Sequence, residues 1–150
     1  MNEFDTYKSH LEKYPNIAQI KEKVRKIITQ KGLSSVMSDT KWLELQKAIE
    51  DLPFPPPFTL KCVTDDSNSP PMEFDKIPSY HGDWSSYYYE GLPPFFNIEW
   101  MEVYPKCRKY RGKLIADEIL DETEAFVAVL KNLAIPYTEE GGVFTIYGYK

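Results

Sequence analysis

The chain has 150 residues, of which 42% are hydrophobic, 15% aromatic and 27% charged, and 23 acidic against 18 basic side chains give a net charge of −5. This composition is typical of one folded domain and excludes a disordered chain, which would be poor in aromatic residues. The apolar runs are far shorter than the roughly 20 residues of a membrane helix, and the acidic start lacks the apolar segment of a secretory signal. Because two cysteines are too few for a disulfide framework, the sequence predicts a cytoplasmic protein that neither spans nor binds a membrane.

Charge and aromatic residues are unevenly distributed along the chain. Residues 51–100 carry a net charge of −6 and hold nine of the 12 prolines and 11 of the 22 aromatic residues. Such a segment repels nucleic acid phosphate and suits a basic protein partner, because complementary potentials steer association. The alternative is that the aromatic residues fill a core and the acidic residues face water.

The first predicted element is an amphipathic helix at residues 16–31. Apolar residues recur at spacings of three and four between Ile17 and Ile28, and Gly32 stands where a C′ glycine ends a helix. We expect one α+β domain over residues 1–150, with residues 1–38 as an N-terminal helical extension.

A second helix is predicted at residues 39–51, with Ser38 or Asp39 as its cap. Its buried face is formed by Trp42, Leu45, Ile49 and Leu52. The proline-rich segment 52–58 ends this helix, because proline lacks the N–H that a helix needs. We interpret the segment as a stiff strap over the core, the alternative being a ligand for an aromatic groove.

Alternating or β-prone residues predict strands at residues 58–63 and 95–104. Residues 72–94 show no sustained period and indicate irregular structure. Residues 105–112 are expected to turn, with residues 113–115 returning as a partner strand.

The last predicted helix begins with a capping box formed by Asp121 and Glu124. Two further strands are expected at residues 135–137 and 143–149, joined by a turn at residues 138–142. The predicted fold is therefore α+β, with three main helices packed on a mostly antiparallel sheet of four or five strands.

Histidines and cysteines provide no recognisable metal site. His10, His81, Cys62 and Cys107 lack zinc-ligand spacing, and no cofactor-binding motif is present. We therefore expect no metal and no cofactor, and no catalytic residue is assigned.

Cys107 is the better candidate for a reactive thiol, because the surrounding lysines and arginines would lower its pKa. The alternative is an ordinary cysteine in a polar turn. The basic segment 106–113 could stack a base and hold phosphate through Tyr110, or it could be a hairpin tip with solvated charges.

The most distinctive segment is residues 80–91, which contains three consecutive tyrosines. Adjacent side chains diverge in any regular structure, so at least one of these tyrosines is expected to be exposed. Tyrosine and tryptophan are common interface anchors, and acidic residues border them. The predicted partner-binding residues are Asp65, Asp66, Asp83, Trp84, Tyr87, Tyr88, Tyr89 and Glu90.

Six phrases of the sequence, taken together and in order, resemble a family. They are Lys41-Trp42 to Ile49, Leu52-Pro53-Phe54-Pro55-Pro56-Pro57-Phe58, Gly82-Asp83-Trp84, Pro94-Phe95-Phe96-Asn97-Ile98-Glu99-Trp100, Asp121-Glu122-Thr123 and Ile146-Tyr147-Gly148-Tyr149. The family is one of small bacterial cytosolic proteins of unknown function, and the resemblance covers residues 41–149. It implies a bacterial, cytoplasmic, single-domain protein, and it implies no activity, substrate or catalytic residue.

These observations favour a non-enzymatic acidic protein-binding domain. Its concrete form would be an immunity protein that neutralises a bacterial toxin by occupying a basic cleft. The alternative is a small metal-assisted or histidine-dependent hydrolase that uses His81, Asp83 and Glu99. The oligomeric state does not follow from the sequence.

Overall fold

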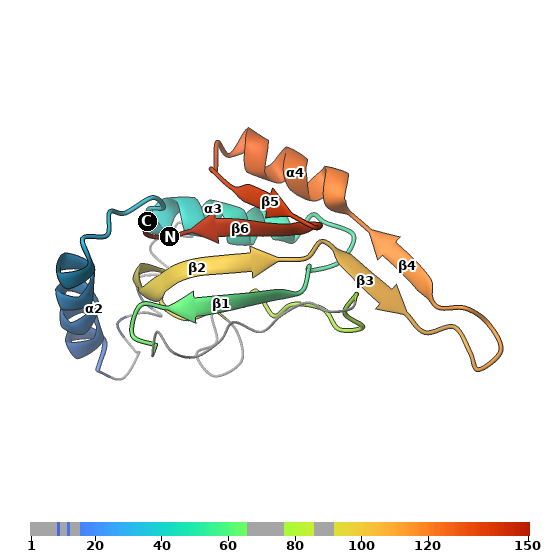
Figure 1. The fold of residues 1–150 in the computed structure, drawn as a ribbon, viewed down its shortest axis with the longest axis horizontal. Coiled ribbons are helices and arrows are strands. Elements are labelled where there is room, and N and C mark those ends of the chain that lie inside the picture. The colour runs from blue at the N-terminus through green and yellow to red at the C-terminus, as the bar shows by residue number, and fades with distance from the viewer. Residues whose placement is uncertain (1–8, 10–11, 13–15, 66–76, 86–91) are drawn as a thin grey trace.

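The computed structural model describes residues 9, 12, 16–65, 77–85 and 92–150. Within these residues the helices are α2 (Ile17–Lys31), α3 (Asp39–Ile49), the short 3-10 helix η1 (Phe95–Asn97) and α4 (Thr123–Asn132). The strands of the same residues are β1 (Phe58–Cys62), β2 (Ile98–Val103), β3 (Lys106–Lys109), β4 (Glu118–Asp121), β5 (Thr138–Glu140) and β6 (Val143–Tyr147). They form an antiparallel sheet of order β1-β2-β6-β5 and a separate two-stranded β3–β4 hairpin. The predicted α+β fold is confirmed (Figure 1).

The core lies between the four-stranded sheet and helices α3 and α4 (Figure 1). Each helix contributes the apolar face that its sequence period defines, and the sheet contributes the inward side chains of β2 and β6. Seven of these side chains have no measurable or almost no exposure: Trp42, Leu45, Phe126, Leu130, Ile98, Met101 and Ile146. Burial of this apolar surface is the main driving force for the fold.

Helices α2 and α3 lie where the sequence predicts them. The side chain of Ser38 accepts a hydrogen bond from the backbone N–H of Lys41, as expected of an N-cap. Gly32 adopts a left-handed conformation with φ of 67° and ends α2. After α2, the backbone N–H groups of Ser34 and Val36 donate to carbonyls of Lys150 and Gly148. The segment between α2 and α3 is therefore tied to the C-terminal end of the chain.

The proline-rich segment is a strap over the core, as predicted. Pro56 and Pro57 are fully buried, and the indole N–H of Trp84 donates to the carbonyl of Pro56 at 2.9 Å. The backbone N–H of Gly82 donates to the carbonyl of Pro55. A Cβ atom at Gly82 would lie 2.2 Å from the Pro56 carbonyl oxygen, so this contact requires glycine.

The strand predicted at residues 95–104 begins three residues later than expected. Residues 95–97 form η1, and the predicted strand is shorter because Asn97 makes other interactions. Its carbonyl accepts from the N–H of Val63, and its side-chain amide bonds to both the N–H and the hydroxyl of Thr64. These bonds take the place of the regular hydrogen bonds to a neighbouring strand that residue 97 would form within a β-strand.

The predicted turn at residues 105–112 and the return strand at 113–115 are wrong. Residues 106–109 form β3, which pairs with β4 at residues 118–121, so residues 110–117 form the tip of a longer hairpin. The tip is held by a hydrogen bond from Arg111 Nε to the carbonyl of Ala116. Figure 1 shows this hairpin projecting from the body of the protein.

Two boundaries near the C-terminus also differ from the prediction. Helix α4 begins at Thr123, and Asp121 accepts a hydrogen bond from the backbone N–H of that residue rather than starting the helix itself. The strand expected at residues 135–137 lies at 138–140, because Ala134 turns the chain with φ of 55° and Pro136 has no N–H for a ladder. The turn to β6 is then only Gly141 and Gly142, both with positive φ.

Candidate functional site

The predicted partner-binding residues are only partly within the structure. Asp66, Tyr87, Tyr88, Tyr89 and Glu90 lie outside the described residues, so the expected exposure of a tyrosine stays a prediction. Asp65 and Asp83 are exposed. Asp65 accepts a hydrogen bond from the N–H of Cys62, and Asp83 accepts two from Ser85.

Trp84 is a core side chain and does not present its ring to a partner. It is 7% exposed and packs edge-on against Phe58 with 4.9 Å between ring centroids. Its indole N–H is already used by Pro56. Trp84, named above as a partner-binding residue, is thus a core side chain in this structure, because the proline-rich strap covers it.

The residues of the alternative hydrolase hypothesis have separate surroundings. His81 stacks on Phe54 with 5.5 Å between ring centroids. Glu99 pairs with Lys61 at 2.9 Å and lies 3.9 Å from Lys31, near the opposite end of β1. Asp83 bonds to Ser85. Each of the three residues thus has different partners, and no contact among the described residues joins them. The geometry therefore gives the hydrolase hypothesis no support.

Cys107, the candidate for a reactive thiol, does not lie in the basic, accessible surroundings that would lower its pKa. Cys107 is buried in β3 rather than placed in a polar turn. Burial raises the pKa of its thiol, and the nearby Glu122 carboxylate raises it further. Cys62 also has a raised pKa, about 12, mainly because of burial. Neither thiol is activated.

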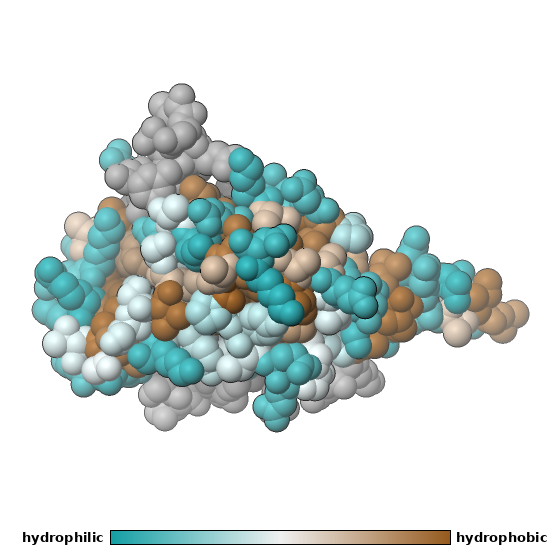
Figure 2. All heavy atoms as spheres, turned by 90° about the horizontal axis from the view of Figure 1, so that it is seen from above, coloured by the Kyte–Doolittle hydropathy of each residue, from teal (hydrophilic) through white to brown (hydrophobic). Residues whose placement is uncertain are grey.

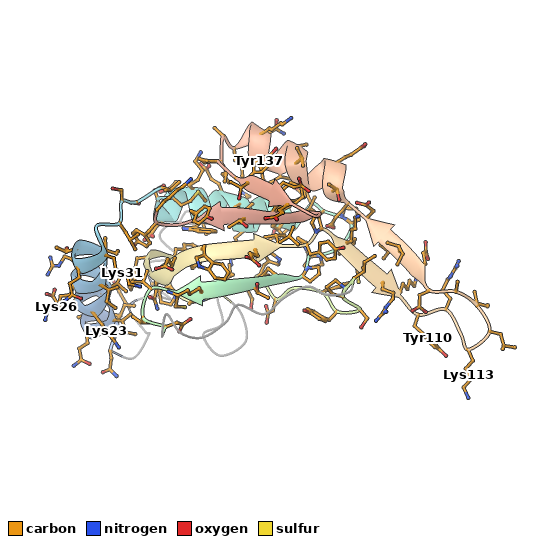
Figure 3. All side chains as sticks on the ribbon, in the orientation of Figure 1. Lys23, Lys26, Lys31, Tyr110, Lys113 and Tyr137 are labelled. Carbon is orange, nitrogen blue, oxygen red and sulfur yellow. The ribbon has the colours of Figure 1, made fainter. Side chains whose placement is uncertain are left out.

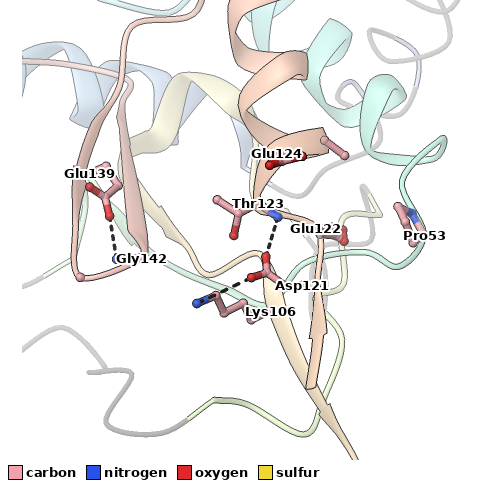
Figure 4. A pocket seen from close by; sticks show the side chains of 10 residues that line it. Pro53, Lys106, Asp121, Glu122, Thr123, Glu124, Glu139 and Gly142 are labelled. Carbon is pink, nitrogen blue, oxygen red and sulfur yellow. Dashed lines mark hydrogen bonds and ion pairs between the residues drawn. The ribbon is translucent and has the colours of Figure 1, made fainter. Parts of the chain in front are cut away.

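The structure instead brings acidic residues together in a hollow of about 880 Å³. We call it the acidic hollow. It lies between the start of α4 and the β5–β6 turn, beside the base of the β3–β4 hairpin (Figure 4). Its lining consists of Pro53, Lys106, Asp121, Glu122, Thr123, Glu124, Ala125, Glu139, Gly141 and Gly142. Four acidic residues and one lysine thus line the hollow, and the carboxyl of Glu122 is buried in its wall.

Two carboxylates of the hollow are fixed by local hydrogen bonds. Asp121 accepts from the N–H of Thr123 at 2.9 Å and lies 3.8 Å from Lys106 Nζ. The side chain and the backbone N–H of Thr123, together with Lys106, hold the pKa of Asp121 below its usual range. Across the hollow, Glu139 accepts from the N–H of Gly142 at 2.8 Å (Figure 4). Both carboxylates therefore keep a defined position, and the lowered pKa of Asp121 favours its charged form.

Glu122 is the unusual member of the hollow. It is 3% exposed, and neither carboxylate oxygen forms a hydrogen bond of good geometry with the described residues. Burial raises the pKa of Glu122 from 4.5 to about 7; the backbone N–H of Phe54 acts in the opposite direction, and Asp121 adds to the increase. Near neutral pH this carboxyl is therefore poised between its neutral and charged forms.

The hollow gathers acidic side chains of the kind that pair with cationic groups. Among the residues that the structure describes, no three His, Cys, Asp or Glu side chains are placed to hold a metal ion. An open hollow of this size admits several side chains of another protein segment. In the part of the chain that the structure describes, no helix has the length and apolar character needed to cross a membrane.

Sequence reasoning missed the acidic hollow. The acidic run at residues 121–124 and the pair Glu139 and Glu140 are visible in the sequence. Their juxtaposition depends on α4, the β5–β6 turn and the hairpin base meeting in space, and no local pattern shows that.

The fold and the hollow define a small α+β domain with an acidic concave surface. The family described as "Family of unknown function (DUF6678)" matches residues 24–150, so the chain belongs to this family. The match begins within α2, and therefore extends further toward the N-terminus than the resemblance over residues 41–149. Comparison with curated proteins found no match, and comparison with solved structures found none either.

Proposed function

We propose that the protein is a non-enzymatic acidic domain that binds a basic segment of a partner protein in the acidic hollow. The observation that carries the proposal is the lining of the hollow, which contains three exposed acidic residues, Asp121, Glu124 and Glu139, and a single basic residue, Lys106. An arginine or lysine side chain entering the hollow would meet charge-assisted hydrogen-bond acceptors. The −5 net charge of the chain would also speed the approach of a basic partner.

The shape of the hollow favours a protein segment over a small ion. Its volume of about 880 Å³ exceeds what one cation needs, and Pro53, Ala125 and two glycines provide apolar or small surfaces between the carboxylates. Mixed apolar and charged surroundings suit a peptide segment, whose aliphatic stems and charged heads both find partners.

The more specific form of the proposal is an immunity protein of a bacterium, which acts in the cytoplasm on a toxin with a basic cleft. This form is supported by the small size and acidity of the chain and by the absence of a recognisable catalytic motif in its sequence. Such a protein inhibits by occupying the cleft, and needs no chemistry of its own.

Charge reversal in the hollow tests the binding proposal. Glu124 is exposed in the first turn of α4, so Glu124→Lys should leave the fold intact. We expect this variant to bind a fluorescein-labelled hexa-arginine peptide at least about tenfold more weakly in fluorescence anisotropy. Glu50→Lys, an identical change at the end of α3 outside the hollow, is the matched control. Equal binding by both variants would refute the proposed site.

The immunity form needs a second experiment. Wild-type protein and Glu124→Lys are used as baits in a lysate of the native cell. The proposal expects a basic protein that only the wild type retains, and whose enzymatic activity falls when purified wild-type protein is added. A retained protein whose activity is unchanged would contradict the immunity form and leave the binding domain in place.

A further inference from the structure

The tip of the β3–β4 hairpin is the most exposed apolar surface among the described residues. Leu114 is 100% exposed, Tyr110 67% and Ile115 56%, and Ile119 continues the surface along β4. Exposed apolar side chains gathered in one place mark an interaction site rather than a solvated loop. Figure 2 shows hydrophobic residues at the end of a projection that extends away from the body.

The tip is also basic, in contrast to the rest of the chain. Residues 109–116 include Lys109, Arg111 and Lys113 and no acidic residue. Figure 3 shows Tyr110 and Lys113 at the far end of the hairpin. A second copy of this chain, with its net charge of −5, is therefore an attractive partner for the tip.

The acidic hollow lies at the other end of the same hairpin. Lys106 begins β3 and Asp121 ends β4, and both line the hollow. The chain from Lys106 to Lys113 spans about 23 Å when extended. The hairpin projects from the body of the protein (Figure 1), so its tip points away from the hollow at its own base, although it has the charge that the hollow requires.

We propose that two copies of the chain form a symmetric dimer in which the hairpin tip of each copy occupies the acidic hollow of the other. The inference rests on the proposed function, because it names an occupant of the same hollow. A two-fold axis between the two hairpins would relate the copies, so that the same tip-to-hollow contact forms once on each side of the interface.

The free edge of β4 fits this arrangement. On the β3 side, the N–H of Arg108 donates to the carbonyl of Pro78, so that edge is partly covered. In the part of the chain that the structure describes, no strand pairs with the outer edge of β4. Two β4 edges that meet antiparallel place the tip end of one hairpin beside the base of the other, where the hollow opens.

The chemistry of the tip matches the hollow in two respects. Lys113 and Arg111 supply cations for the exposed carboxylates of Glu124 and Glu139. Leu114, which follows Lys113 in the tip, gains apolar contact with the small and apolar lining of the hollow. A basic partner protein must then displace the hairpin of the second copy, so dimerisation and partner binding compete.

Charge swapping gives a sharp test by sedimentation velocity, at chain concentrations from about 5 to 500 µM. The wild type should form dimers, and the dimer should weaken as salt rises from about 50 to 500 mM. Lys113→Glu and Glu124→Lys should each be monomeric, because each places like charges in both contacts. An equimolar mixture of the two variants should restore the dimer, since each tip then meets a hollow of opposite charge. Lys23→Glu, on exposed α2, is the control and should behave as wild type.

The outcomes separate this inference from the proposed function. A wild type that is monomeric throughout, or a mixture that stays monomeric, overturns the dimer. If hexa-arginine still binds in that case, the proposed function stands. If the dimer forms but Lys113→Glu, whose hollow is vacant, fails to bind hexa-arginine, the proposed function is wrong and the dimer stands. A monomeric wild type whose Leu114→Ser variant loses binding to phosphatidylglycerol vesicles would reassign the tip to a lipid surface and overturn the inference.

Discussion

Glu122→Gln should stabilise the protein above neutral pH. In the folded state burial raises the pKa of Glu122 from 4.5 to about 7, so the neutral form is the one that the fold favours. Below pH 4.5 the carboxyl is protonated in both the folded and the unfolded chain, and the pKa difference costs no stability. As pH rises toward 7 the unfolded chain ionises freely while the folded chain resists, so the free energy of unfolding falls.

The size of the effect follows from the two pKa values. A move from 4.5 to about 7 corresponds to about 3 kcal/mol of lost stability at pH 8. Glutamine has nearly the same shape and is neutral at every pH, so the variant should recover up to this amount at pH 8 and nothing at pH 4.5. For a domain of this length, the gain corresponds to a rise in Tm of about 6–12 °C.

Urea unfolding followed by tryptophan fluorescence measures this change, because Trp42 and Trp84 are buried in the folded state. Glu124→Gln, an exposed residue in the same helical turn, is the matched control and should change stability by less than about 0.5 kcal/mol. All ionisable groups other than the substituted one are the same in every variant, so the difference between variants isolates Glu122. A gain for Glu122→Gln that is equal at both pH values, or absent at pH 8, would refute the reasoning.

Three further changes test the packing and capping described above. Gly82→Ala should destabilise the protein by about 1–3 kcal/mol in urea unfolding, because its Cβ would meet the Pro56 carbonyl at 2.2 Å; an unchanged midpoint would contradict this close approach. Asp121→Ala should remove about 0.5–2 kcal/mol at pH 7 through loss of the bond to the N–H of Thr123. The pKa of Asp121 is lowered in the fold, so the loss should shrink as pH falls below 3.8, where the wild type also loses its carboxylate; a loss independent of pH would argue against a charged cap. The thiol of Cys107 should react with Ellman's reagent at pH 8 only after unfolding, because it is buried and its pKa is raised; rapid reaction of the native protein would show that it is accessible.

Helix α3 shows how much local sequence predicts. Ser38 caps it, Trp42, Leu45 and Ile49 face the core, and both the cap and the face are set by residues within one short segment. The proline strap was predictable for the same reason, since the backbone restriction of proline is local. Elements of this kind need no information from distant parts of the chain.

The β3–β4 hairpin shows where such reasoning ends. Residues 113–115 are expected from the sequence to form a strand, yet they lie in the tip, and the strand that pairs with β3 begins five residues after Lys113, at Glu118. Strand register depends on which segments meet in space, and the hydrophobic pattern here is too short to fix it. The acidic hollow has the same origin, because it is assembled from the strap, the hairpin base, α4 and the β5–β6 turn.

Most phrases by which the sequence resembles its family are explained by packing. Pro56 and Pro57 are buried in the strap, and Gly82 permits its close approach. Gly148 has the same role, since a Cβ there would lie 2.0 Å from the carbonyl oxygen of Ile98. These residues therefore report the fold and carry no information on function.

The phrase Asp121-Glu122-Thr123 is different, because packing does not explain Glu122. Asp121 accepts the backbone N–H of Thr123 at the start of α4, but the carboxyl of Glu122 is buried without a hydrogen bond of good geometry among the described residues. At neutral pH and above it lowers stability by about 3 kcal/mol compared with a neutral side chain of the same shape. A buried polar group without a hydrogen-bond partner normally lowers stability, and proteins tolerate such exceptions mainly at functional sites. Glu122 meets that description, and it lines the hollow where we place the basic partner. If Glu122→Gln is more stable at pH 8 and binds hexa-arginine at least about tenfold more weakly, stability and binding are opposed at this residue. A variant that is more stable and binds as well as the wild type would remove Glu122 from the binding site.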